Sequence, residues 1–138
     1  MRTRIALPTG AASGALGCAV QFWVLSPPLP PRSEYFLTEL ARGQVGIVSI
    51  PLMLASAVAL GYYARTSVVL IGLAIASLFP LVAVYEATKY RGSHNLIPFE
   101  FVAIAICTTP LMLAAWFGRV MARRAGRDPR PTTRPDVA

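Results

Sequence analysis

The sequence predicts an all-α polytopic membrane protein, folded as an antiparallel bundle of four transmembrane helices. Hydrophobic residues make up 55% of the 138 positions, and charged residues only 14%. A soluble domain needs about 25% charged residues to cover its surface, so most of this chain requires lipid as its solvent. The apolar residues are also gathered into four runs, each close to the roughly 20 residues that cross a bilayer as a helix. We therefore assign residues 1–118 to a transmembrane domain.

Each predicted span is bounded by polar or turn-forming residues. The four spans cover residues 5–25, 45–64, 67–85 and 98–117. Only residues 65–66 separate the second span from the third, and a turn that short forces an antiparallel hairpin. Between the first two spans, a proline-rich stretch precedes a predicted interfacial helix at 33–42, which carries Phe36, Leu37 and Leu40 on one face.

The C-terminal residues 119–138 differ from the rest of the chain. They hold six arginines and three prolines and few apolar side chains, so we expect a disordered tail. The positive charge suits retention in the cytoplasm and attraction to anionic lipids. Aromatic residues do not alternate with the arginines, and we predict no nucleic-acid partner.

The distribution of basic residues orients the four spans, because lysine and arginine are retained on the cytoplasmic side. One face collects nine basic residues and the other collects four. The nine are Arg2, Arg4, Arg65, Arg119, Arg123, Arg124, Arg127, Arg130 and Arg134, and the four are Arg32, Arg42, Lys89 and Arg91. With the acidic residues included, the first face carries the whole net charge of +7. Both termini are therefore predicted to be cytoplasmic. The predominance of arginine over lysine suggests a GC-rich bacterial genome, so we expect the protein in a bacterial inner membrane.

The first run also has features of a cleavable signal. Ala15-Leu16-Gly17-Cys18 resembles a loose lipobox after an arginine-bearing start, and cleavage there would leave three spans. However, the leucine stands one position late, and the apolar run continues to Leu25. We therefore expect the first span to be retained.

Several chemistries are disfavoured by what the spans lack. No charged residue lies at the middle of a predicted span, whereas ion-coupled transport usually needs one there. His94 is the single histidine, so one chain cannot build a haem site with two histidine ligands. Cys18 and Cys107 have no metal-ligand spacing. We predict no metal and no cofactor.

Polar side chains gather at one outer corner, between the third and fourth spans. The candidate binding residues there are Glu86, Lys89, Arg91, His94, Asn95 and Glu100. Glu100 falls in the first turn of an apolar helix, where the helix dipole favours a carboxylate and where a cationic partner is needed. One interpretation is a polar loop in which Lys89 or Arg91 pairs with Glu86 or Glu100. The other is a site at which a partner protein docks.

The segment Ser93-His94-Asn95-Leu96-Ile97-Pro98-Phe99-Glu100 resembles a segment of small uncharacterised bacterial inner-membrane proteins with four helices. The resemblance covers eight residues and implies no activity.

Small residues and prolines mark the interiors of the spans. Gly10, Gly14 and Gly17 form a face on which helices can approach closely, either within the bundle or in a homodimer. Pro51, Pro80 and Pro110 each remove a helix hydrogen bond within a span and predict kinks.

The function that these features favour is a non-enzymatic accessory or partner-binding subunit. Its predicted partners are the lipid bilayer and either another membrane protein or further copies of itself, and the 86–100 corner is its contact surface. A small oligomeric channel or transporter lined by the kinked spans is an alternative. A further alternative is an enzyme of the outer face that uses His94 and Glu100.

Overall fold

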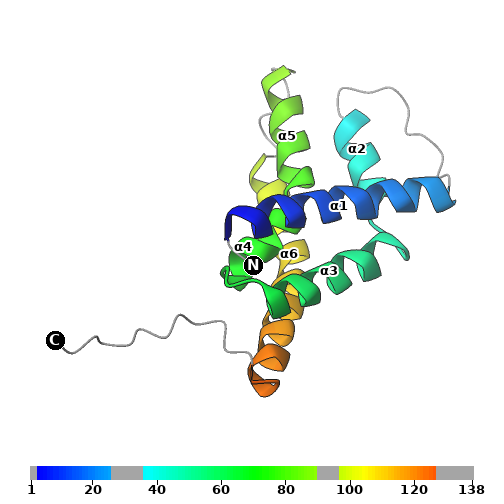
Figure 1. Ribbon diagram of the computed structural model, residues 1–138. Coiled ribbons are helices and arrows are strands. Elements are labelled where there is room, and N and C mark those ends of the chain that lie inside the picture. The colour runs from blue at the N-terminus through cyan, green and yellow to red at the C-terminus, as the bar shows by residue number, and fades with distance from the viewer. Residues whose placement is uncertain (1–2, 26–35, 90–96, 127–138) are drawn as a thin grey trace.

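The computed structural model describes residues 3–25, 36–89 and 97–126, and all regular structure in these ranges is helical (Figure 1). The prediction of an all-α chain is confirmed for this part of the protein. The helices are α1 (Thr3–Leu25), α2 (Phe36–Gly43), α3 (Ser49–Tyr63), α4 (Val68–Ile75), α5 (Leu78–Lys89) and α6 (Ile97–Arg124).

Helices α1 and α3 run antiparallel to each other and cross the direction of α5 and α6, which are also antiparallel to each other. In Figure 1, α1 and α3 run across the view in opposite directions, whereas α5 and α6 run up and down it. The most extensive contact joins α3 to α6, and α1 packs on α3 and α4. The short helix α2 packs on α5, beside the end of that helix farthest from α4.

Two of the described helices are long and apolar enough to cross a membrane. They are the stretches Arg4–Leu25, with 22 residues, and Ile104–Arg124, with 21 residues. The bent pair α4 and α5 raises the number to three if it counts as one span. Helix α3 is apolar but has only 15 residues, which corresponds to about 22 Å of helix at 1.5 Å per residue. The second predicted span, 45–64, is therefore helical only from Ser49 onwards.

The predicted third span, 67–85, is broken rather than continuous. Helix α4 ends at Ile75, α5 begins at Leu78, and the two axes differ by 56°. Pro80 has no N–H to donate to the carbonyl of Ala76, which instead accepts the N–H of Phe79 at 3.1 Å. Pro80 consequently stands in the first turn of a new helix, where a missing N–H costs nothing.

The other two prolines behave differently from each other. Pro51 is the third residue of α3 and so also lies in a first turn, which means that no kink is needed in the interior of that helix. Pro110 lies inside α6, which continues through it from Ile97 to Arg124.

Helix α6 extends beyond the predicted end of the fourth span at residue 117. Residues 119–124, expected to belong to a disordered tail, continue the helix. Arg119 donates a hydrogen bond from Nη2 to the carbonyl oxygen of Thr66, and Ala122 is fully buried. These two contacts stabilise the helical conformation of residues 119–124. The expectation for residues 127–138 lies outside the described part of the chain.

The seam between α3 and α6 is a close contact between two helix backbones. A Cβ atom on Gly61 would overlap the Ala115 carbonyl oxygen, and one on Gly118 would overlap that of Val58. Ala57 and Ala115 are fully buried beside them. Glycine and alanine allow helix backbones to approach until little space remains between them.

The predicted glycine face of α1 also lies inside the chain. A Cβ atom on Gly14 would overlap the carbonyl oxygen of Ile75, and one on Gly10 would stand 3.1 Å from the Cβ of Ala74. At Gly17 the nearest atom would be Cγ of Met53, at 3.5 Å. The three glycines thus face α3 and α4, which leaves this face occupied by the same chain.

Candidate functional site

The best-defined polar site joins α2 to α5 through Glu86. The side chain is only 3% exposed, and three donors from α2 converge on its two carboxylate oxygens. The backbone N–H of Leu37 donates to Oε1 at 2.6 Å, and that of Thr38 donates to Oε2 at 3.1 Å. The hydroxyl of Thr38 donates to the same Oε2. We call this arrangement the Glu86 joint.

The Glu86 joint pairs backbone N–H groups at the start of the short helix α2. The first N–H groups of any helix have no partner within it, and an acidic side chain at that end also interacts favourably with the helix dipole. In an apolar solvent each unpaired N–H costs several kcal/mol. Glu86 supplies both the acceptors and the negative charge, although it lies 48 residues away from Thr38. The site is therefore a structural clamp between two helices.

The neighbouring cation does not approach Glu86 in the way that the sequence predicted. Lys89 Nζ lies 3.5 Å from the hydroxyl of Tyr85 and 5.7 Å from the centre of its ring. Glu86 instead accepts its hydrogen bonds from α2. Among the described residues, Glu86 is therefore held by the N-terminus of α2 rather than by Lys89. A pairing of Arg91 with Glu86 or Glu100 stays a prediction.

The remaining predicted residues of the corner lie outside the described residues. Arg91, His94 and Asn95 fall between α5 and α6, and the side chain of Glu100 is likewise not described, although its backbone is helical. The expected pairing of Glu100 remains a prediction. Among the described residues, there is no group of three or more side chains of the types that ligate metals.

A second buried clamp joins α1 to α3, and sequence reasoning missed it. Gln21 is 5% exposed, and its Oε1 accepts the backbone N–H groups of Val48 at 2.9 Å and Ser49 at 3.0 Å. The hydroxyl of Ser49 accepts the N–H of Gly46 at 2.9 Å. A Cβ atom on Gly46 would overlap Nε2 of Gln21, so a side chain at this position would displace the Gln21 amide. The available signal was an amide side chain near the end of an apolar run, which is costly there without a partner.

The third feature is an apolar pocket of about 450 Å³. It is bounded by the end of α2, one face of α3, the break between α4 and α5, and the upper half of α6. Its lining residues are Arg42, Val45, Ile50, Met53, Leu54, Ala76, Phe79, Ile104, Cys107, Pro110 and Leu111. Cys107 is an exposed free thiol, whereas Cys18 is a buried free thiol in α1.

Comparisons with protein-family models, with curated proteins and with solved structures find no match for this chain. Its function must therefore be argued from these three sites: two clamps that satisfy helix N-termini, and one pocket with apolar walls.

Proposed function

We propose that this chain is a four-span protein of a bacterial inner membrane, with both termini in the cytoplasm. In this proposal it is a non-enzymatic accessory subunit that docks a membrane-protein partner at the corner where α2 meets α5. The Glu86 joint is the observation that carries the docking proposal, and the exposed apolar side chains carry the membrane location.

Large hydrophobic side chains cover the outside of the described helices. Trp23 is 87% exposed and Ile47 is 80% exposed, and Leu16, Leu81 and Ile106 are all more than half exposed. A monomer in water rarely exposes apolar surface on this scale, whereas lipid would cover it without cost. This pattern supports a bilayer as the surroundings of both helix pairs.

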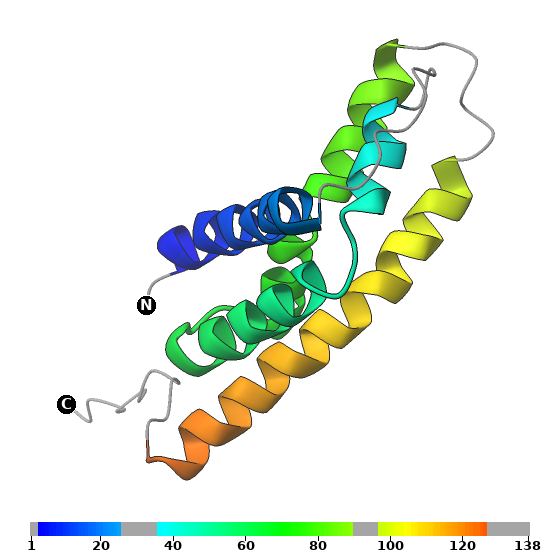
Figure 2. The same cartoon turned by 90° about the vertical axis from the view of Figure 1, so that its right-hand side faces the viewer.

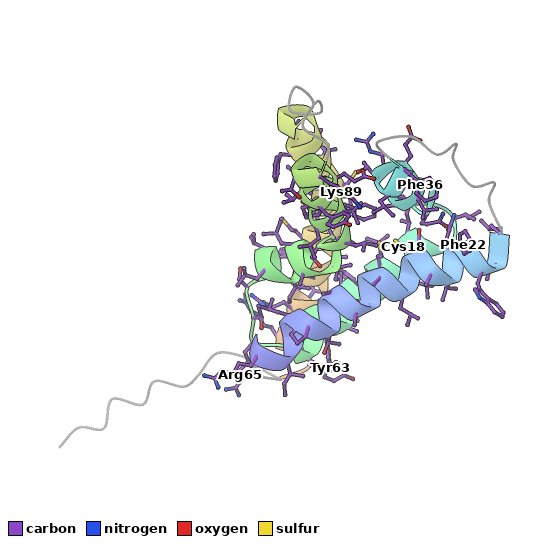
Figure 3. All side chains as sticks on the ribbon, turned by 90° about the horizontal axis from the view of Figure 1, so that it is seen from above. Cys18, Phe22, Phe36, Tyr63, Arg65 and Lys89 are labelled. Carbon is purple, nitrogen blue, oxygen red and sulfur yellow. The ribbon has the colours of Figure 1, made fainter. Side chains whose placement is uncertain are left out.

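The positions of the helix ends support the four-span topology. In Figure 2 the start of α1, the turn between α3 and α4, and the end of α6 lie toward one side, and the end of α5 and the start of α2 lie toward the other. Figure 3 displays Arg65 and Tyr63 at the end where α1 begins, far from Lys89 and Phe36. The first of these sides is the one to which the basic residues assign the cytoplasm.

The Glu86 joint makes the opposite corner a rigid surface. Glu86 holds the start of α2 against α5 before any partner binds. Association therefore does not have to include the entropy cost of ordering α2. Exposed side chains on it include Leu37 and Glu39 from α2, and Tyr85 and Lys89 from α5. An aromatic and an aliphatic group beside charges of both signs suit a protein partner of mixed character.

The channel and enzyme alternatives draw less support from the described residues. The pocket beside the α4–α5 break has apolar walls, which do not replace the hydration shell of an ion. The enzyme alternative depends on His94 and Glu100, whose side chains lie outside the described part.

Topology can be tested with reporter fusions. Fusions placed after Arg65 and at Ala138 should report a cytoplasmic location, and fusions near Arg32 and Gly92 should report an external one. An external signal at Ala138 would refute the four-span arrangement, because an even number of spans returns the chain to its starting side.

Docking can be tested with a photo-crosslinking amino acid at Leu37 or Tyr85 in cells. We expect one discrete cross-linked partner band from each position, and loss of both bands in the Glu86→Ala variant. The same amino acid at Leu113, an exposed site on α6, serves as the control and should not give that band. Bands that persist unchanged in Glu86→Ala would show that the Glu86 joint does not organise the docking surface.

A further inference from the structure

The N-terminus of α4 differs from those of α2 and α3. Glu86 accepts N–H groups at the start of α2, and Gln21 accepts those at the start of α3. At α4 the N-cap residue Ser67 makes no capping hydrogen bond with its side chain. The first backbone bond runs from the N–H of Ile71 to the carbonyl oxygen of Ser67, at 3.1 Å. The N–H groups of residues 68–70 therefore have no acceptor within the helix.

A buried hydroxyl group without a partner stands beside this N-terminus. Thr66 directly precedes Ser67 and is only 2% exposed. Among the described residues, its Oγ1 has no hydrogen-bond partner. A buried polar group in that condition costs free energy, which a ligand that bonds to it recovers.

Arg119 of α6 reaches the same turn from the neighbouring helix. Its Nη2 donates to the carbonyl oxygen of Thr66, whereas its Nε is buried and has no partner within the described part of the chain. Arg123, one turn further along α6, interacts electrostatically with Arg119, and Arg65 precedes Thr66 in the turn. Like charges one helical turn apart repel each other, so an anion close to both is favoured.

The groups gathered at this turn can all donate hydrogen bonds. They are helix N–H groups, guanidinium N–H groups and a hydroxyl. The two acidic side chains that the structure describes, Glu39 and Glu86, belong to α2 and α5, toward the other side of the molecule (Figure 2). Oxygen atoms of a phosphate accept from all three kinds of donor, and helix N-termini and arginine side chains both bind phosphate. Arg119 is half-buried and Ser67 is exposed, so the turn can be reached from outside the helices.

We propose that the turn between α3 and α4 binds a phosphate group, held by the N-terminus of α4, the hydroxyl of Thr66 and the guanidinium group of Arg119. The phosphate belongs either to the headgroup of an anionic phospholipid or to free inorganic phosphate, because the same donors fit both. The proposal depends neither on docking at the Glu86 joint nor on the direction in which the chain crosses a membrane. Its failure would leave the cross-linking and reporter-fusion results unchanged.

The test uses the full chain in a maltoside detergent, which contains no phosphate. NMR signals of the backbone amides of residues 68–70 and of the Arg119 Nε–H group are followed during two titrations. One titration adds short-chain phosphatidylglycerol, and the other adds inorganic phosphate. We expect saturable shifts of these signals, while the amides of Leu37 and Thr38 stay unchanged. Saturation with phosphatidylglycerol alone identifies a lipid headgroup, and saturation with inorganic phosphate identifies the free ion.

Two variants test the side chains that hold the phosphate. Arg119→Gln should weaken binding about tenfold, because a charge-assisted hydrogen bond contributes about that factor. Thr66→Val should weaken binding about threefold, because it removes one neutral hydrogen bond. Without a ligand, Thr66→Val should not lower the unfolding midpoint, because the hydroxyl has no described partner to lose.

The matched control is Arg124→Gln, which removes the same charge from an exposed site in the last turn of α6. It should change the affinity by less than about twofold, because solvent and salt screen an exposed charge. Equal losses in Arg119→Gln and Arg124→Gln would overturn the proposal, since they would show attraction to the overall positive charge. The absence of saturable shifts at residues 68–70 with both probes would also overturn it.

A further variant tests whether the chain supplies its own anion to this turn. Asp128 and Asp136 lie outside the described residues. Replacing both by asparagine should leave the affinity for the probe within about twofold of the wild-type value. A larger gain would reassign the turn to a carboxylate of this chain and overturn the proposal. If Arg119→Gln does not fold, Thr66→Val and the wild-type titrations still decide.

Discussion

The two halves of α6 pack in contrasting ways. The second half contributes Leu111, Ala115, Gly118 and Ala122, all of which are buried, at spacings of three to four residues that keep them on one face. The first half instead borders an open pocket, which is lined by its residues Ile104, Cys107 and Pro110. Small residues let the backbones of α3 and α6 meet, whereas the break before Pro80 sends α5 away from α6. The tight seam between α3 and α6 follows from the small side chains of its glycines and alanines. The open space beside α5 follows from the helix break before Pro80, which has no N–H to donate.

The largest expected effect comes from adding one methyl group to the tight half. Gly118→Ala should destabilise the protein by about 3 kcal/mol, because the new Cβ overlaps a backbone oxygen of α3 that cannot move alone. The matched control is Gly43→Ala, at a helical glycine with nothing within 4 Å of the added atom. Unfolding midpoints in mild detergent measure both. Similar midpoints would contradict the description of the seam as a backbone contact.

The second prediction concerns the Glu86 joint, which holds α2 against α5. Glu86→Ala removes the acceptor of two backbone donors and one hydroxyl, and should cost about 2–3 kcal/mol. Glu86→Gln keeps an acceptor oxygen and should cost about 1 kcal/mol. Hydrogen exchange at the amides of Leu37 and Thr38 should rise in both variants.

The control for Glu86 is Glu39→Gln, an exposed site on α2, which should leave exchange and stability near the wild-type values. Unchanged protection of the Leu37 and Thr38 amides in Glu86→Ala would show that α2 holds its place by other contacts.

A third prediction concerns the neutral clamp at the start of α3. Gln21→Leu should destabilise by about 1–2 kcal/mol, because the N–H groups of Val48 and Ser49 lose their acceptor. Gly46→Ala should give a similar loss, since its Cβ displaces the same amide group. The double variant should then be little worse than either single one, because both changes remove one interaction. Additive losses in a double-mutant cycle would contradict the shared cause.

The smallest effect should come from filling the open half. Ile104→Phe adds volume beside a pocket of about 450 Å³ and should change stability by less than about 1 kcal/mol, because no tightly packed neighbour must move. Midpoints measured beside those of Gly118→Ala give the contrast directly. A loss as large as that at the seam would mean that the first half of α6 is packed as tightly as the second.

The helices themselves follow from local patterns in the chain. The apolar runs predicted α1, α3 and α6 within a few residues at most ends. The sidedness inferred from the arginine distribution stays a prediction. The glycine face of α1 was also visible at its GxxxG spacing, although the spacing did not say whether the partner helix belongs to the same chain. These are properties of near neighbours in sequence, and hydropathy and spacing report them.

The candidate site was less accessible to such reasoning. Glu86 was selected as a polar residue at a corner, but its partner was sought among nearby cations rather than at the start of α2. Gln21 was not selected at all. These hydrogen bonds depend on which helix N-terminus lies close in space to the Glu86 or Gln21 side chain. Local patterns in the sequence do not report distances between segments far apart in the chain.

The sequence by itself determined that the described chain is helical and that its helices are apolar, because hydropathy and helix periodicity act residue by residue. Only the tertiary structure decided where the third predicted span breaks, which helix Glu86 holds and where a pocket opens between α3, α5 and α6. Those outcomes depend on backbone N–H donors and on side-chain volumes contributed by segments far apart in the chain. These groups come into contact only when the segments pack together.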